Sequence, residues 1–177
     1  MLVKKGAELT DGEVDEVNAA KAREFKVPPM SEKQKIKTIF FLLEEEEKIL
    51  ALGELIPIEP IKFNAETFFV LGIGGIVANE KRRGYGREIM TAIKAYLKVH
   101  DKTGVGSCGL RNKEFYEKCG LGVDISSLKR FVYRKKGRKI INTTDDGIIY
   151  QDGPDCFMKK VLSSPDQEVL LERPFNW

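Results

Sequence analysis

Apolar residues near the amino terminus recur at helical spacing. Between residues 10 and 25 they fall on one stripe, with acidic residues early and basic residues late, which predicts an amphipathic helix. Thr10 and Asp11 are candidate N-caps for it. The sequence Val27-Pro28-Pro29 ends this helix, and residues 31–37 then form either a second short helix or a charged loop.

Two apolar stretches around a charged turn predict a β-hairpin. The stretches span residues 38–43 and 49–58, and the turn spans residues 44–48. Four consecutive glutamates in the turn, Glu44 to Glu47, are interpreted as solvated surface charge rather than as a metal site. Residues 63–67 are expected to link the hairpin to the next strand.

The most informative stretch reads as a strand, a tight basic turn and a helix. The apolar run 68–78 leads into Lys81-Arg82-Arg83-Gly84-Tyr85-Gly86-Arg87, and apolar residues at helical spacing follow as far as His100. Glycines let the backbone approach a ligand closely, and free N–H groups at a helix start can converge on an anion. This turn is therefore predicted to bind a phosphate or pyrophosphate. It matches neither a Walker loop nor the dinucleotide fingerprint.

Beyond the helix the pattern predicts short strands and one short helix. Residues 105–110 read as a strand, and Asn112 is a candidate cap for a short helix whose Phe115 and Tyr116 face inward. A helix-end cation is the plainer role for His100. Further strands are predicted at residues 129–134, 139–142, 147–151, 156–161 and 168–172.

Composition narrows the class of protein. A chain of 177 residues, 42% of them hydrophobic, is expected to form a single domain, 1–177. The net charge of +3 is too mild for a nucleic-acid-binding protein. Three cysteines without paired spacing favour neither a disulfide framework nor a zinc site, so we expect no metal and a reducing cytoplasm. The sequence offers no signal peptide and no membrane span, and we expect no membrane partner.

Two motifs resemble the GNAT superfamily of N-acetyltransferases. Lys81-Arg82-Arg83-Gly84-Tyr85-Gly86 is similar to that family's acetyl-CoA pyrophosphate loop, and Asn112 to Leu121 is similar to its second signature, an Asn followed by Phe-Tyr-x-x-x-Gly-Phe. The departures are Lys81, where Gln or Arg is usual, and Leu121, where Phe is usual. Both departures are conservative, and neither removes a backbone donor.

The resemblance implies a fold and an acyl donor. The fold would be an α/β (α+β) GNAT fold, in which a mixed, mostly antiparallel twisted sheet is flanked by helices and a bulged strand opens the sheet at the acyl-CoA site. Residues 129–177 would be a family-variable extension of strands. The donor would be acetyl-CoA, and the residues expected to bind it are Gly75, Ile76, Val77, Lys81, Arg82, Arg83, Gly84, Tyr85, Gly86, Arg87 and Asn112.

The resemblance also implies two catalytic groups. Tyr116 would protonate the departing thiolate, and the strand N–H near Ile76 would stabilise the oxyanion of the tetrahedral intermediate. The acetyl group would pass directly to the amine, without a cysteine nucleophile. The general base stays open among Glu54, Asp145, Asp146, the terminal carboxylate and a water chain.

A weaker resemblance, to the aminoglycoside 2'-N-acetyltransferases, concerns the acceptor. It implies that Ser107, Asp145, Asp146 and Trp177 line the acceptor site. The chain departs from that family in its closing Phe175-Asn176-Trp177 and in Gly72, where the family has an acidic residue.

Together these resemblances imply an N-acetyltransferase that acts on a primary amine of a small molecule, with an aminoglycoside-like or polyamine-like acceptor. The alternatives are a protein or peptide N-acetyltransferase and a degenerate acyl-CoA-binding sensor module. A homodimer would agree with family habit.

Overall fold

The computed structural model describes residues 1–135, 138–141 and 146–174. The chain divides into two compact units: the first comprises residues 1–56 and 74–96, and the second comprises residues 57–73 and those from 97 onward. Each unit is described below by itself. Among the described residues, no helix is both long enough and apolar enough to cross a membrane.

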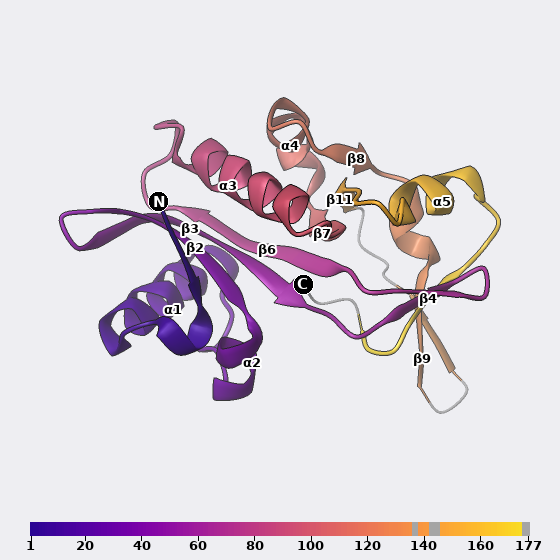
Figure 1. The fold of residues 1–177 in the computed structure, drawn as a ribbon, viewed down its shortest axis with the longest axis horizontal. Coiled ribbons are helices and arrows are strands. Elements are labelled where there is room, and N and C mark those ends of the chain that lie inside the picture. Colours follow the sequence, from indigo (N-terminus) through magenta and orange to yellow (C-terminus); the bar gives the residue numbers. More distant parts are fainter. Residues whose placement is uncertain (136–137, 142–145, 175–177) are drawn as a thin grey trace. The chain divides into compact units, whose positions relative to one another are not determined.

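The strands form two sheets (Figure 1). The larger sheet has seven strands in the order β1-β2-β3-β6-β7-β11-β8, and the smaller has five in the order β10-β9-β12-β4-β5. The larger sheet is mixed, because β6 and β7 run parallel whereas β1–β2, β2–β3, β7–β11 and β11–β8 are antiparallel pairs. This agrees with the predicted mixed, mostly antiparallel sheet flanked by helices.

The first unit consists of one part of the larger sheet and the helices that cover it. Its elements are β1 (Leu2–Lys5), η1 (Gly6–Glu8), α1 (Asp11–Phe25), α2 (Glu32–Lys37), β2 (Ile39–Glu45), β3 (Lys48–Pro57), the end of β6 (Leu71–Ala78) and most of α3 (Tyr85–Val99). The predicted helix over 10–25 is confirmed, and residues 31–37, left open, form the helix α2. Thr10 caps α1, since its hydroxyl accepts from the N–H of Glu13 at 3.2 Å.

Alternation along β3 separates the two faces of this unit. Leu52 belongs to a buried cluster with Val17 and Ala20 of α1. The neighbouring Gly53 faces α3 instead, because a Cβ added there would lie 2.5 Å from Ile89. Consequently α1 covers one face of β2 and β3, and α3 covers the other.

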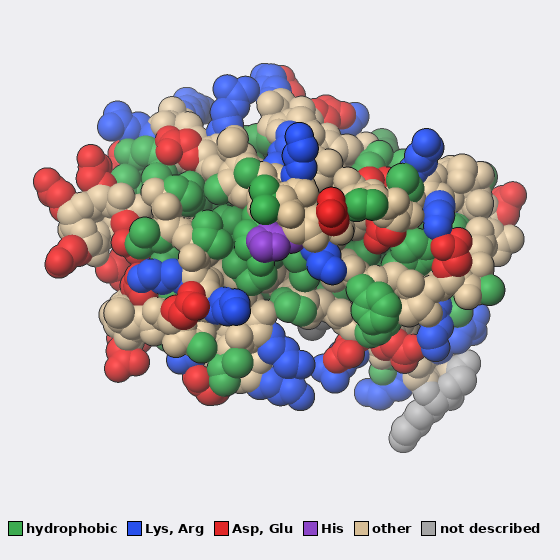
Figure 2. All heavy atoms as spheres, in the orientation of Figure 1, with side chains coloured by type: hydrophobic (Ala, Val, Ile, Leu, Met, Phe, Trp, Pro, Cys, Tyr) green, Lys and Arg blue, Asp and Glu red, His purple; other side chains and the backbone are tan. Residues whose placement is uncertain are grey.

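The β2–β3 hairpin is confirmed, with one difference at its turn. Glu46 and Glu47 both have positive φ, as in the two-residue hairpin turn that matches strand twist. Glu45, Glu46 and Glu47 are exposed, and Figure 2 shows acidic side chains gathered over this tip. Glu44 is different: it is half-buried, burial raises the pKa of its carboxyl group, and its Oε1 has no hydrogen-bond partner among the described residues.

The second unit holds the remaining strands and a second core. Its elements are β4 (Ile61–Phe63), β5 (Glu66–Phe68), the start of β6, β7 (Gly104–Cys108), η2 (Leu110–Asn112), α4 (Lys113–Lys118), β8 (Gly122–Asp124), η3 (Ser127–Arg130), β9 (Phe131–Lys135), β10 (Arg138–Ile141), β11 (Gly147–Gln151), α5 (Phe157–Ser163) and β12 (Val169–Leu171). Its core includes Phe68, Phe131 and Phe157, all buried.

Two predictions about elements in this unit are wrong. Residues 156–161 were predicted as a strand, but residues 157–161 belong to the helix α5. The Asp152 carboxylate accepts from the N–H groups of Met158 and Lys159 in its first turn. Residues 63–67 are not a simple link. They close a β4–β5 hairpin, with Asn64 and Ala65 both at positive φ.

The short helix after residue 112 also differs from the prediction. Asn112 does not cap α4 with its side chain, because its backbone is already helical and continues from the 3-10 turn η2. Phe115 does not face inward: it is 36% exposed, whereas Tyr116 is 8% exposed.

Candidate functional site

Asn79 precedes the basic turn and forms hydrogen bonds to the first unit. The Asn79 backbone N–H donates to the Leu50 carbonyl at 2.8 Å, and its side-chain amide donates to the Ile49 carbonyl at 2.5 Å. Its Oδ1 accepts from the Arg23 guanidinium of α1 at 2.7 Å. These three bonds hold the end of β6 in place, so the turn that follows starts from a fixed position.

The turn itself relies on left-handed backbone. Arg82 has φ 64° and Gly84 has φ 86°, and a Cβ added at Gly84 would meet nothing within 4 Å. The Gly84 carbonyl accepts from the N–H groups of Arg87 and Glu88 and thereby starts α3. At the first turn of a helix the N–H groups lack intrahelical acceptors, so those of Tyr85 and Gly86 are placed to bind an anion.

Positive side chains surround this helix start. Lys81 pairs with Glu24 at 2.9 Å, and Arg83 lies 3.6 Å from Glu80. A hydrogen bond with the Tyr85 side chain raises the pKa of the Arg83 guanidinium, so it stays charged. Exposed ion pairs contribute little to stability, and these cations can exchange a carboxylate for a phosphate at small cost.

Gly75 interrupts the strand that feeds the turn. It has φ 60°, a conformation that residues with a Cβ rarely adopt. The parallel pairing of β6 with β7 is found at Leu71–Gly104 and Gly72–Val105, a few residues before it. Glycine therefore marks an irregularity in β6, as predicted.

The residues after Gly75 point to alternate faces. Ile76 packs toward α3, where its Cδ1 lies 2.9 Å from the position of a Cβ added at Gly53. Val77 is buried in the cluster with α1. Neither side chain has polar chemistry to offer, so the strand's contribution to a site rests on its backbone groups.

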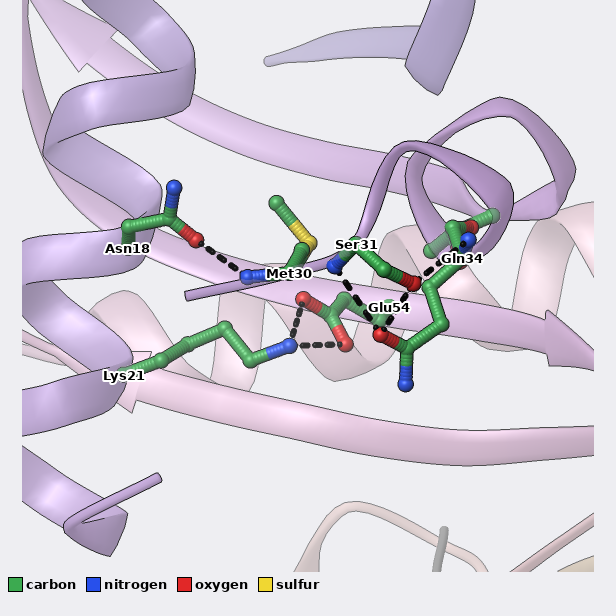
Figure 3. A network of polar contacts seen from close by, with 7 residues as sticks. Asn18, Lys21, Met30, Ser31, Gln34 and Glu54 are labelled. Carbon is green, nitrogen blue, oxygen red and sulfur yellow. Dashed lines mark hydrogen bonds and ion pairs between the residues drawn. The ribbon is translucent and has the colours of Figure 1, made fainter. Parts of the chain in front are cut away.

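A buried ion pair lies directly against Gly75. The Glu54 carboxylate, 3% exposed, accepts from the Lys21 ammonium at 2.7 and 2.9 Å (Figure 3). A Cβ added at Gly75 would lie 2.7 Å from the Glu54 carboxyl carbon. The sequence suggested Glu54 as one of several candidate bases, because residues 68–78 hold no carboxylate and Glu54 lies on the preceding strand, but it did not suggest Lys21.

The loop between α1 and α2 is held close to this pair's helix. The Met30 N–H donates to the Asn18 side chain of α1 at 3.0 Å, and Ser31 and Gln34 exchange hydrogen bonds at the start of α2 (Figure 3). These contacts fix residues 30–34 beside the helix that carries Lys21.

In the second unit, the Tyr116 side chain of α4 is buried. Burial, together with the nearby Cys108 and Cys119, raises the pKa of Tyr116 to about 12. The side chain is therefore a neutral proton donor at physiological pH. Phe115 packs against it edge-on, with ring centroids 5.0 Å apart.

The predicted acceptor residues fall partly within the described chain. Ser107 lies on β7 opposite Ile148 of β11. Asp146 is half-buried, and its Oδ1 lies 3.7 Å from the position of a Cβ added at Gly109. Burial, followed by the charge of Asp146, raises the pKa of the Cys108 thiol. Asp145 and Trp177 lie outside the described residues.

Searches by sequence found no relatives: no protein-family model matches the chain, and no curated protein matches it. Solved structures do resemble it. Escherichia coli ElaA gives a TM-score of 0.60 at 13% identity, covering 85% of this chain and 97% of that one. A Pseudomonas aeruginosa acyl-CoA N-acyltransferase gives 0.56 at 16% identity, with coverage of 85% and 97%. A GNAT family acetyltransferase from Elizabethkingia anophelis, solved with acetyl-CoA bound, gives 0.52 at 13% identity, with the same coverage. This chain has the GNAT fold.

Within this GNAT fold the predicted residues divide between the two units. The first unit brings Gly75, Ile76, Val77 and the turn 81–87 into one continuous strand, turn and helix. The second holds Ser107, Asn112, Tyr116 and Asp146 on or beside β7, α4 and β11. Among the residues that the structure describes, no cluster of metal-binding side chains occurs.

Proposed function

We propose that the protein is an acetyl-CoA-dependent N-acetyltransferase that transfers an acetyl group to a primary amine of a small molecule. The observation that carries the proposal is the strand with left-handed Gly75, followed by the anchored basic turn and the start of α3, on a GNAT fold. A helix start flanked by four cations suits the pyrophosphate of a coenzyme A thioester.

In this proposal, residues 75–77 act through their backbone groups. The N–H near Ile76 binds the thioester carbonyl and the oxyanion that forms when the amine attacks, which is the step that preorganised donors accelerate most. Lys81, Arg82, Arg83 and Arg87, with the N–H groups of Tyr85 and Gly86, hold the pyrophosphate. Asn112 completes the set of residues assigned to the coenzyme.

Tyr116 is the proposed general acid. A hydroxyl whose pKa is about 12 remains protonated at neutral pH and can give its proton to the departing thiolate. The raised pKa of Cys108 keeps that thiol protonated and makes it a poor nucleophile, which favours direct transfer to the amine over an acyl-cysteine intermediate.

The acceptor side is assigned to Ser107, Asp145, Asp146 and Trp177. Free cysteines at Cys108, Cys119 and Cys156 suit a reducing cytoplasm, where we place the protein. A homodimer and a single domain over 1–177 stay predictions.

Release of CoA thiol from acetyl-CoA tests the proposal. We expect turnover with one class among aminoglycosides, polyamines, amino acids and short peptides, and an increase in melting temperature with acetyl-CoA alone. Turnover restricted to peptides would favour protein acetylation instead. Stabilisation by acetyl-CoA, with no acetyl transfer to any of these amines, would favour the sensor module.

The Tyr116→Phe variant tests the assigned acid. We expect kcat to fall by about 10²- to 10⁴-fold, the usual contribution of a positioned acid, while the KM for acetyl-CoA changes little. Tyr133→Phe, in β9 of the same unit, is the matched control and should leave both constants unchanged. Undiminished turnover by Tyr116→Phe would refute the assignment.

A further inference from the structure

Within the described part of the chain, Glu54 is the only charged residue that is buried. Both of its carboxylate oxygens accept from one ammonium, that of Lys21, at 2.7 and 2.9 Å. The Lys21 side chain is 16% exposed and the Glu54 side chain is 3% exposed. The lysine therefore lies on the solvent side of the carboxylate that it covers.

The pair lies against Gly75 of β6. Gly75, at φ 60°, leaves free the space that the Glu54 carboxylate fills, since an added Cβ would lie 2.9 Å from Glu54 Oε2. Glycine adopts this left-handed conformation readily and has no Cβ, so another group can approach its backbone closely. The Glu54 carboxylate can occupy this place only because residue 75 is a glycine. Gly75 lies on the strand whose backbone N–H groups are proposed to bind the acetyl carbonyl.

Stability alone is a weak reason for such a pair. Replacing a buried ion pair by apolar side chains of similar volume is often neutral or favourable, because two charges must be desolvated. The same α1 also forms a more exposed ion pair, Lys4–Glu13, with β1. A charge pair at Gly75 therefore calls for a chemical role.

We propose that Glu54 binds the ammonium group of the acceptor amine, and that Lys21 is an internal stand-in which the acceptor displaces. This inference rests on the proposed acetyl transfer. Lys21 presents a primary ammonium on an unbranched four-carbon stem, so the acceptor class is an unbranched aliphatic primary amine. A ring amine, whose nitrogen is attached to a branched carbon, fits this position poorly.

Glu54 also receives a proton in the transfer. The bound ammonium gives one proton to the carboxylate, which later releases it to solvent. The nitrogen lone pair forms the N–C bond to the acetyl carbonyl carbon, and the C–S bond breaks as sulfur leaves with its electron pair. Sulfur takes up one proton, and the nitrogen gives up its second proton to solvent. An ammonium and a thioester thereby yield an amide, a thiol and one proton.

Two substitutions should act in opposite directions. Glu54→Gln keeps the shape but neither pairs with an ammonium nor takes a proton, so kcat/KM for n-butylamine should fall about 10²- to 10⁴-fold. Lys21→Met removes a competitor present at an effective concentration in the millimolar range, so the KM for n-butylamine should fall about three- to tenfold. A purely structural pair would make both variants slower, and that result would overturn the proposal.

The matched controls are Lys4→Met and Glu13→Gln, which break the ion pair between β1 and α1. Neither should change the KM for n-butylamine. Wild-type protein provides a test that needs no variant: n-butylamine should be acetylated at least about tenfold more efficiently than tert-butylamine, because only the unbranched amine follows the path of Lys21. Equal efficiency would overturn the proposed acceptor class.

Binding of amines without acetyl-CoA separates this inference from the proposed function. In Lys21→Met, n-butylamine should raise the melting temperature by restoring a partner to Glu54, whereas n-butanol should not. The double variant Lys21→Met/Glu54→Leu should show no rise. If acetyl-CoA neither binds nor turns over while this rise is seen, the proposed function fails and the amine site stands. If acetyl-CoA turns over without the rise, the amine site fails.

Discussion

At the scale of single residues, Gly75 and Glu54 show how a backbone conformation and a side chain depend on each other. Gly75→Ala should lower the free energy of unfolding by more than about 1–2 kcal/mol, the usual cost of left-handed backbone with a Cβ, because the methyl group also meets the Glu54 carboxylate. Urea unfolding measures this loss.

Alanine substitutions at two other glycines distinguish the cost of left-handed backbone from the cost of a steric clash. Gly84→Ala, at φ 86° with open space around it, should cost only the backbone term of about 1–2 kcal/mol. Gly12→Ala, in the first turn of α1 with nothing near its Cβ and an ordinary φ, should be neutral or stabilising by up to about 1 kcal/mol. Equal losses at Gly75 and Gly84 would show that Glu54 moves aside freely.

Tyr116 should make the protein sensitive to alkali. Its pKa is about 12 in the folded state, and the ordinary value is 10.0, so the folded state holds this proton more tightly. The corresponding stabilisation, about 2–3 kcal/mol, is fully present below pH 10 and is lost as the pH rises from 10 toward 12. Unfolding free energies between pH 8 and pH 11.5 measure this decrease.

Tyr116→Phe is the control for that titration. The difference in unfolding free energy between wild type and variant should stay constant up to about pH 10 and then shrink as the unfolded wild-type chain ionises. A difference that does not change with pH would mean that the Tyr116 hydroxyl has an ordinary pKa.

Local sequence was enough to find the residues of the basic turn, because glycines, charges and a helix start are contiguous there. It was enough to suggest Glu54 among several candidate bases, because that carboxylate lies on the strand that precedes residues 68–78. It could not find Lys21, which is 33 residues from Glu54 in sequence and meets it only when α1 packs on the sheet. The side-chain partners of a buried charge depend on packing that no local pattern encodes.

At the scale of elements, the turn before α3 depends on Asn79. Asn79→Ala removes the bonds to the Ile49 carbonyl and to Arg23, each with a typical net value of about 1 kcal/mol. We expect the KM for acetyl-CoA to rise about five- to thirtyfold while the KM for the acceptor amine stays the same.

Thr91→Ala in α3 is the matched control, because it removes one exposed side-chain bond to the Arg87 carbonyl within the helix. It should leave the KM for acetyl-CoA unchanged. A rise in the acceptor's KM in Asn79→Ala, without a change for acetyl-CoA, would contradict the anchoring role.

Elements with strong periodicity were predicted well, and short ones were not. The α1 and α3 helices and the β2–β3 hairpin have caps, stripes and turns that agree with one another. The α5 helix is only seven residues long, and Asp152, which accepts from the N–H groups of Met158 and Lys159, lies five residues before it. At that length apolar spacing does not distinguish a helix from a strand, and the hydrogen-bond acceptors at the helix start determine which one forms.

At the scale of the whole molecule, the two units share secondary-structure elements. The β6 strand and the α3 helix each begin in one unit and end in the other. The sequence predicted a single sheet with an extension of strands. It did not predict the five-stranded sheet, because β12 pairs with β9 and β4, which are distant in sequence.

Cooperativity of unfolding tests the predicted single domain. Phe157 is fully buried in the core of the second unit, so Phe157→Ala should cost about 3–5 kcal/mol. If the chain unfolds as one, amide exchange at Val77 in the first unit and at Val105 in the second should accelerate by the same factor. Leu52→Ala, in the core of the first unit, is the reciprocal variant and should accelerate both amides equally. Acceleration confined to the unit that carries the substitution would show two domains, because shared elements transmit a loss of stability only when both units open together.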